Sequence, residues 1–217
     1  MRVNLRASRK ATRRWPLISG IAAVALAGAL GLVVALRFGN LPFAFDSIWM
    51  TEVLEERIVW FDVPARFMDW LGGGWFGVVI VPVCLVILLC TAGRYWGAAY
   101  YGIAAVLSVG VVQMLKAALD RPRPEDILVL TDSGSFPSGH VANAATAAVV
   151  LAIIVSRWWV WFAGVAYIAL MALSRTYLGA HWLSDTIGGA MIGAGVAVIV
   201  WAPLAYRLDR ERRPVRG

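Results

Sequence analysis

Long apolar stretches recur along this chain, and each is long enough to cross a lipid bilayer as a helix. A helix needs about 20 apolar residues to span roughly 30 Å of hydrocarbon. Only 15% of the residues are charged and 60% are hydrophobic, whereas an average soluble domain has about 25% charged residues. We therefore predict an all-α membrane protein, a bundle of six transmembrane helices in a single domain. The predicted spans are residues 15–36, 75–92, 95–119, 139–157, 158–174 and 182–206.

The positive charge predicts the orientation of this bundle. The net charge is +7, and most of the basic residues lie in two end segments, residues 1–14 and 207–217. Basic flanks next to apolar spans favour the cytoplasmic side. Both termini are then cytoplasmic, and the segments 38–74 and 120–137 lie outside. Basic residues arranged in this way do not indicate a nucleic-acid partner.

The outer segment 38–74 combines six acidic residues with aromatic and aliphatic ones, a mixture that predicts one or two interfacial helices. It carries no motif from which we infer a role.

The first span has an alternative interpretation as a cleaved signal peptide, because residues 27–29 resemble a cleavage site. Its apolar run of about 22 residues is longer than the usual 7–15, so we predict a span. Cys84 and Cys90 point to different sides of a helix and suggest neither a disulfide framework nor a metal motif.

The first of three polar clusters follows the span 95–119. Lys116 lies near the outer end of this helix, and Arg123 follows seven residues later. Pro122, between these two cations, and Pro124, after them, keep the chain extended. Two cations placed in this way are able to reach one anion from different directions. The alternative is a pair of interfacial cations whose charged ends extend to water.

The second cluster is Pro137-Ser138-Gly139-His140, at the start of the fourth span. The first turn of a helix offers unpaired backbone N–H groups that bind phosphate. The hydroxyl of Ser138 adds a donor, and Gly139 allows an anion to approach the backbone closely. His140 then lies beside the anion. The alternative is an ordinary serine N-cap with an unrelated histidine.

The third cluster contains His181 and Asp185, which are four residues apart and share a face of the last helix. A carboxylate on one imidazole nitrogen fixes the tautomer and leaves the other nitrogen as a nucleophile. Asp185 is the only acidic residue within a predicted span, and ionisable residues at that depth are usually functional. The alternative is a buried, mutually satisfied pair. Ser174 and Arg175 precede the histidine.

Together these clusters resemble the signature of the type 2 phosphatidic acid phosphatase (PAP2) superfamily. The signature consists of the patterns K-x6-R-P, P-S-G-H and S-R-x5-H-x3-D, and all eleven specified residues occur here with the same spacing between residues 116 and 185. The matching residues are Lys116, Arg123, Pro124, Pro137, Ser138, Gly139, His140, Ser174, Arg175, His181 and Asp185.

The resemblance implies a six-helix bundle with its active site at the extracytoplasmic face, and a phosphatase without metal or other cofactor that forms a phosphohistidine. It implies that His181 is the nucleophile, Asp185 its orienting partner and His140 the general acid. Phosphate binding would then fall to the remaining polar groups. These are Lys116, Arg123, Arg175, Ser138 and the backbone of Gly139. Pro124, Pro137 and Ser174 belong to the motifs without a specific chemical role.

The expected substrate is a membrane lipid phosphate, with a polyprenyl diphosphate favoured because the site would face the outer leaflet. Phosphatidylglycerol phosphate and phosphatidate are the alternatives within the same activity. A lipid phosphotransferase and a non-catalytic lipid-phosphate binding protein remain open, and a soluble-type haloperoxidase is disfavoured by the spans. We expect a multi-pass protein of a bacterial cytoplasmic membrane. The sequence does not determine the oligomeric state.

Overall fold

A computed structural model describes residues 5–36, 40–131 and 134–212 of the chain, and its regular elements are helices. The elements are α1 (Leu5–Leu36), α2 (Ala44–Glu55), the short η1 (Val59–Phe61), α3 (Asp62–Gly72), the π-helical η2 (Phe76–Ile80), α4 (Val81–Thr91), α5 (Tyr95–Leu119), α6 (Gly139–Val155), α7 (Trp158–Tyr177) and α8 (Leu183–Arg212).

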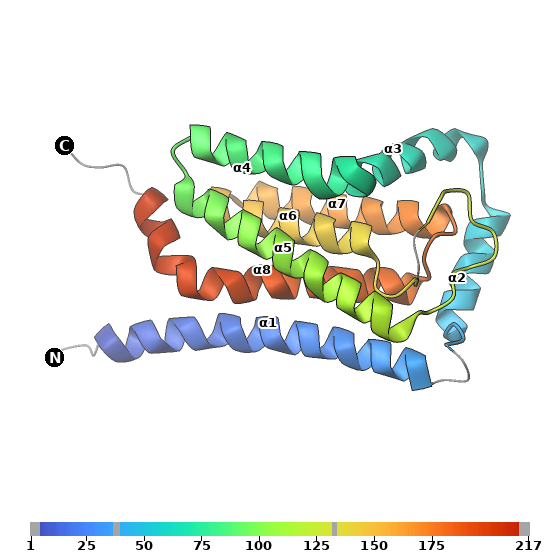
Figure 1. The fold of residues 1–217 in the computed structure, drawn as a ribbon, viewed down its shortest axis with the longest axis horizontal. Helices are drawn as coiled ribbons and strands as arrows, with labels where there is room; N and C mark the ends of the chain where they lie inside the picture. Colours follow the sequence, from blue (N-terminus) through green and yellow to red (C-terminus); the bar gives the residue numbers. More distant parts are fainter. Residues whose placement is uncertain (1–4, 37–39, 132–133, 213–217) are drawn as a thin grey trace.

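The long helices lie side by side, and α2 crosses one end of them (Figure 1). The start of α1 and the end of α8 lie at the opposite end of the bundle. Helix α6 is central, because it contacts α5, α7 and α8. Its contact with α8 is very close: a Cβ added to Gly193 would lie 2.2 Å from the carbonyl oxygen of Ala142. Small residues at this interface allow the two backbones to approach, as is usual in membrane bundles.

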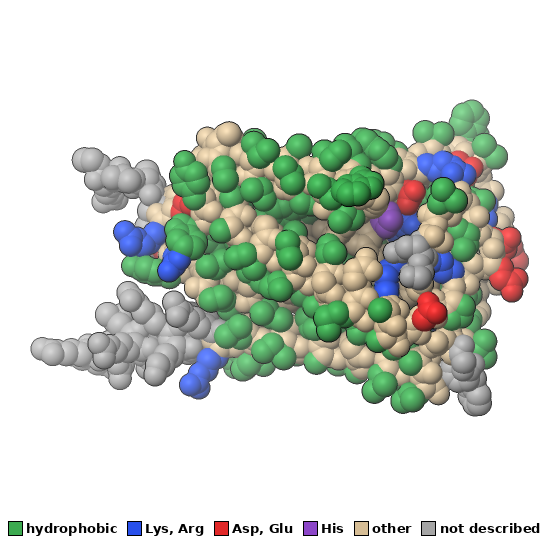
Figure 2. All heavy atoms as spheres, in the orientation of Figure 1, with side chains coloured by type: hydrophobic (Ala, Val, Ile, Leu, Met, Phe, Trp, Pro, Cys, Tyr) green, Lys and Arg blue, Asp and Glu red, His purple; other side chains and the backbone are tan. Residues whose placement is uncertain are grey.

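The predicted spans agree with the helices in position but not in every length. Within the described residues, four helices are long and apolar enough to cross a membrane, and the α3–α4 pair, bent by 49°, adds a fifth span if the pair is counted as one. The sixth crossing that we predict is α6, which has 17 residues. Hydrophobic side chains cover the flank of the bundle, and charged ones gather at its two ends (Figure 2). The protein is a multi-pass membrane bundle, and six crossings with the stated orientation remain a prediction.

Some boundaries differ from the sequence analysis. Helix α1 begins at Leu5 and α8 continues to Arg212, so the basic segments next to the spans extend the helices rather than ending them. The outer segment contains α2, η1 and α3, in agreement with the interfacial helices predicted there. Residues 1–4, 37–39, 132–133 and 213–217 are outside the described part of the chain, so the basic residues Arg2, Arg213 and Arg216 of the two end segments lie outside it.

Candidate active site

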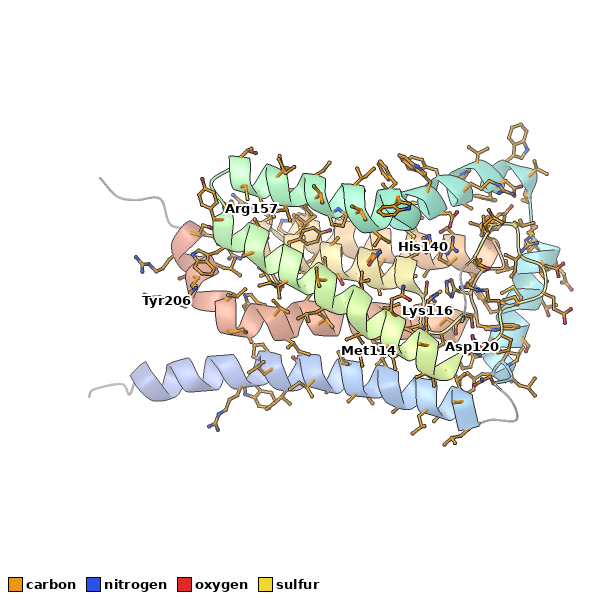
Figure 3. All side chains as sticks on the ribbon, viewed as in Figure 1. Met114, Lys116, Asp120, His140, Arg157 and Tyr206 are labelled. Carbon is orange, nitrogen blue, oxygen red and sulfur yellow. The ribbon has the colours of Figure 1, made fainter. Side chains whose placement is uncertain are left out.

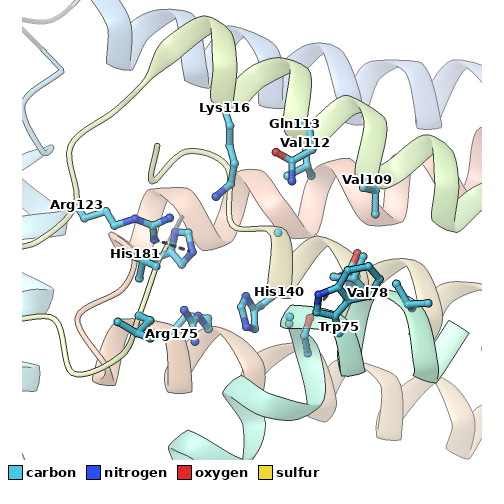
Figure 4. A pocket seen from close by; sticks show the side chains of 18 residues that line it. Trp75, Val78, Val109, Val112, Gln113, Lys116, Arg123, His140, Arg175 and His181 are labelled. Carbon is cyan, nitrogen blue, oxygen red and sulfur yellow. Dashed lines mark hydrogen bonds between the residues drawn. The ribbon is translucent and has the colours of Figure 1, made fainter. Parts of the chain in front are cut away.

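The three predicted clusters come together at the end of the bundle that α2 crosses. Lys116 and His140 lie near this end, whereas Arg157 and Tyr206 lie at the other (Figure 3). A cavity of about 490 Å³ opens between the three clusters. The predicted site residues that line it are Lys116, Arg123, Gly139, His140, Arg175 and His181 (Figure 4).

His181 lies in the loop between α7 and α8, and its side chain is 2% exposed. Its Nδ1 lies 2.7 Å from the carbonyl oxygen of Ser135. Because a carbonyl oxygen only accepts hydrogen bonds, Nδ1 carries the hydrogen and Nε2 keeps a lone pair. Nε2 is 3.5 Å from Nη1 of Arg123, one of the cations lining the cavity. The ring therefore has the tautomer that a nucleophilic Nε2 requires.

Asp185 lies 3.6 Å from His181, measured from Oδ2 to Nδ1, so Ser135 is the nearer partner of the imidazole. The same Oδ2 accepts a hydrogen bond from the backbone N–H of Trp182 at 2.8 Å. The backbone N–H of Ser138 donates to the carbonyl oxygen of Asp185 at 3.0 Å. Asp185 thus holds together the start of α8, the histidine loop and the start of α6.

A buried ionic network lies behind Asp185. Arg121 donates from Nη1 to Oδ1 of Asp185 at 2.5 Å and from Nη2 to Oδ2 of Asp46 at 2.9 Å. Asp46, on α2, also accepts hydrogen bonds from the backbone N–H and the hydroxyl of Ser184 at 2.8 and 2.7 Å. All three charged side chains have 0% exposure. The network joins α2 to the first turn of α8 directly behind the His181 loop.

His140 meets a second carboxylate from the outer segment. Its Nε2 lies 3.1 Å from Oδ1 and 3.0 Å from the backbone oxygen of Asp69 on α3. The same Oδ1 accepts a hydrogen bond from Arg175. Gly73, at the break after α3, lies against the ring, since a Cβ there would be 2.0 Å from Nε2. The end of α3 therefore fixes both the imidazole of His140 and the guanidinium of Arg175.

Backbone carbonyl groups orient the other two cations. Lys116 Nζ donates to the carbonyl oxygen of Gly134 at 3.1 Å, and Arg123 Nη2 donates to the same oxygen at 3.0 Å. Arg123 Nη1 also donates to the carbonyl oxygen of Ala180, next to His181, at 2.6 Å. Lys116, Arg123 and Arg175 thus reach one cavity from three different elements.

The other motif residues have different surroundings. Ser138 is the N-cap of α6, and its buried Oγ has no hydrogen-bond partner among the described residues. A bound anion at this helix start would give the hydroxyl an acceptor. Ser174 instead donates to the carbonyl oxygen of Met171 at 2.9 Å, within its own helix. Pro124 and Pro137 are buried, as expected of residues that fix the backbone.

The pKa of His181 is held well below its ordinary range, first by burial and then by the positive charges of Arg175, Arg123 and Lys116. The imidazole is therefore neutral near pH 7. The unfolded chain takes up this proton near pH 6.5, whereas the folded protein does so only at lower pH. This group therefore lowers the stability of the folded state as the pH falls below about 6.5.

We expect nuclear magnetic resonance of ¹⁵N-labelled protein to show His181 still neutral at pH 6. The chain has two histidines, so the variant His181→Gln, made without a histidine tag, assigns the two sets of ring signals. A midpoint at or above pH 6.5 for His181 in the phosphate-free protein would contradict the described electrostatics.

The family model of the PAP2 superfamily matches residues 97–209, which include all eleven motif residues. The chain belongs to the PAP2 superfamily. Its place is among the membrane lipid phosphatases of that superfamily, as the sequence resemblance predicted.

Similarity to curated PAP2 relatives and to solved structures extends beyond the motifs. The chain is 28% identical over 128 residues to an undecaprenyl-diphosphatase of Sulfolobus acidocaldarius, covering 56% of this chain and 61% of that protein. It is 32% identical over 141 residues to a decaprenylphosphoryl-5-phosphoribose phosphatase of Mycobacterium tuberculosis, covering 63% and 76% of the two chains. The crystal structure of a transmembrane PAP2-type phosphatidylglycerolphosphate phosphatase from Bacillus subtilis superposes with a TM-score of 0.74 at 21% identity, covering 91% and 99%.

Three residues of the site were missed by the sequence analysis: Asp46, Asp69 and Arg121. The two aspartates lie in the outer segment, more than 70 positions before the groups they contact in α6 and α8. Nothing in their local spacing indicates such contacts. Arg121 lies within the first motif, at one of its six unspecified positions, and only its complete burial distinguishes it from a surface arginine.

Proposed function

We propose that this PAP2 protein hydrolyses a lipid phosphate or diphosphate at the outer interface of a cytoplasmic membrane, through a phosphohistidine and without metal. The observation that carries the proposal is the lone pair of His181 Nε2, which lies beside a cavity lined by three cations. Phosphoryl transfer needs positioning and charge stabilisation above all. Lys116, Arg123 and Arg175 supply positive charge that Mg²⁺ supplies in other enzymes.

The reaction has two steps. Nε2 of His181 attacks phosphorus and forms the N–P bond, while the bond from phosphorus to the leaving oxygen breaks and His140 gives that oxygen a proton. A water molecule then attacks phosphorus, returns a proton to His140, and the N–P bond breaks to release phosphate. Burial of His140 disfavours its protonated form, and the carboxylate of Asp69, 3.1 Å from Nε2, counteracts this by favouring that form.

A second cavity supports a lipid substrate. It has a volume of about 440 Å³ and lies between α4, α5, α6 and α7. Its lining is mostly apolar, and it shares Gly72, Val78, Val79, Val109 and Asn143 with the active-site cavity. A hydrocarbon tail entering from the bilayer is able to occupy this cavity while its phosphate lies beside His181. Burying the tail there would position the reacting end.

Among lipid phosphates we favour a polyprenyl diphosphate. The names of the relatives indicate three substrates: undecaprenyl diphosphate, decaprenylphosphoryl-5-phosphoribose and phosphatidylglycerol phosphate. Two of the three carry a single polyprenyl tail. In the orientation predicted from the basic ends, the site faces the outer leaflet, where such a tail would present its phosphate.

The test is phosphate release by the purified protein in detergent with EDTA present. We expect hydrolysis of undecaprenyl diphosphate at a higher kcat/KM than that of phosphatidylglycerol phosphate or phosphatidate, and inhibition by vanadate, which would occupy the phosphate position. A strict requirement for Mg²⁺ would contradict the three-cation site. Labelled phosphate that passes to an alcohol acceptor instead of water would indicate a phosphotransferase.

A further inference from the structure

Two carboxamide side chains line the active-site cavity without a part in the reaction as described. Gln113 is on α5 and Asn143 is on α6, and both line the cavity. Gln113 and Lys116 extend from the same helix in Figure 4. Strongly polar side chains within membrane-embedded helices are costly and usually functional. Their positions therefore call for a ligand with hydrogen-bonding groups.

Both carboxamides lie one helical turn deeper than the groups that act on the phosphoryl group. Gln113 precedes Lys116 by three residues on a helix that runs towards the site, and Asn143 follows His140 by three on a helix that runs away from it. Three residues correspond to about 4.5 Å along a helix axis. The two amides therefore flank the same level of the cavity from two different helices.

A leaving group would occupy this level. In an in-line displacement, the leaving oxygen lies opposite the attacking nitrogen, so it points away from His181. The far end of the cavity is lined by Trp75, Val78 and Val109 (Figure 4). Polarity thus changes along the cavity, from cations to carboxamides and then to apolar side chains. A substrate that matches this order has a reacting phosphate, then a second hydrogen-bonding group, then a hydrocarbon tail.

We propose that Gln113 and Asn143 bind the second phosphate of a lipid diphosphate, the one that leaves with the lipid. This inference rests on the proposed phosphatase function. Phosphate oxygens accept hydrogen bonds, and a carboxamide offers two N–H donors. The amide of Asn143 donates one hydrogen to the carbonyl oxygen of Gly72 at 3.4 Å, which leaves the other for the ligand.

The neutrality of these donors suits their place in the reaction. The three cations concentrate positive charge at the phosphate that is attacked, where charge is redistributed in the transition state. Uncharged amides form weaker bonds than cations do. They orient the leaving lipid monophosphate without retaining it as a tightly bound product.

The experiment compares farnesyl diphosphate with farnesyl phosphate, which share a tail and differ in the leaving group. We expect Gln113→Leu and Asn143→Leu each to lower kcat/KM for the diphosphate roughly tenfold, about the effect of one lost hydrogen bond, and to leave the monophosphate within about threefold. Met114→Leu is the matched control, because this neighbouring side chain is 73% exposed and does not line the cavity. It should alter neither rate.

Equal losses on both substrates, or no loss on either, would overturn the subsite. A wild-type protein that hydrolyses neither lipid would instead refute the proposed function. Binding in the inactive His181→Gln background separates the two cases. In that background, Gln113→Leu should weaken the binding of farnesyl diphosphate roughly tenfold and leave the binding of farnesyl phosphate unchanged. An affinity for farnesyl diphosphate that does not change on substitution would also overturn the subsite.

Discussion

Replacing His181 by glutamine is expected to abolish phosphate release, with a fall in kcat of about four orders of magnitude or more, the scale seen when a covalent nucleophile is removed. The amide N–H of glutamine preserves a donor for the carbonyl oxygen of Ser135, which accepts from Nδ1 at 2.7 Å in the native protein. The fold should therefore persist while the nucleophilic nitrogen is gone. Phosphate release from undecaprenyl diphosphate in EDTA measures the loss.

Two controls accompany this variant. Its elution as a single species from size-exclusion chromatography and an unchanged thermal unfolding midpoint show that the bundle is intact. Brief incubation with terminally ³²P-labelled lipid should label the wild-type protein covalently and leave His181→Gln unlabelled. Residual activity above about 1% of wild type, or equal labelling of the two proteins, would exclude His181 as the nucleophile.

Replacing Arg121 by methionine is expected to destabilise the fold by about 3–5 kcal/mol, the usual cost when one partner of a buried ion pair is removed. Arg121 is the cation between the carboxylates of Asp46 and Asp185, and all three side chains have 0% exposure. Its loss leaves two buried carboxylates facing each other. The unfolding midpoint in detergent, followed by tryptophan fluorescence, should fall clearly below that of wild type.

Arg66→Met is the matched control, because it removes an exposed arginine from α3 in the same outer segment. It should leave the midpoint unchanged. The double variant Asp46→Asn/Arg121→Met carries one buried carboxylate fewer and should regain part of the lost stability. An Arg121→Met protein that unfolds at the wild-type temperature would show that the network is not held together by its charge.

These contacts give the outer segment a role in the site. Asp46 on α2 binds Arg121, which in turn binds Asp185 next to His181. Asp69 on α3 contacts His140 and accepts a hydrogen bond from Arg175. Each histidine is therefore connected to a carboxylate from a helix that precedes the motif region. The segment 38–74, for which the sequence suggested only interfacial helices, supplies part of the polar support of the reacting groups.

The sequence alone predicted some of the residues that line the cavity, namely Lys116, Arg123, Gly139, His140, Arg175 and His181. Apolar stretches of helical length fixed the bundle, because a bilayer leaves a chain of this composition few alternatives. The predicted spans placed Lys116 and His140 at helix ends, and His181 just before the last helix, on one side of that bundle. Such inferences depend on local periodicity, which the order of the residues contains directly.

Only the tertiary structure decided how those residues are supported. The carbonyl oxygen of Ser135, rather than Asp185, is the nearer partner of His181 Nδ1. Asp46 and Asp69 reach the site from helices far away in sequence. Hydrogen bonds between distant residues depend on how helices pack and where loops turn, and the local pattern of residues does not specify these. The chemistry is therefore visible in the sequence, whereas its positioning arises from the packing of the bundle.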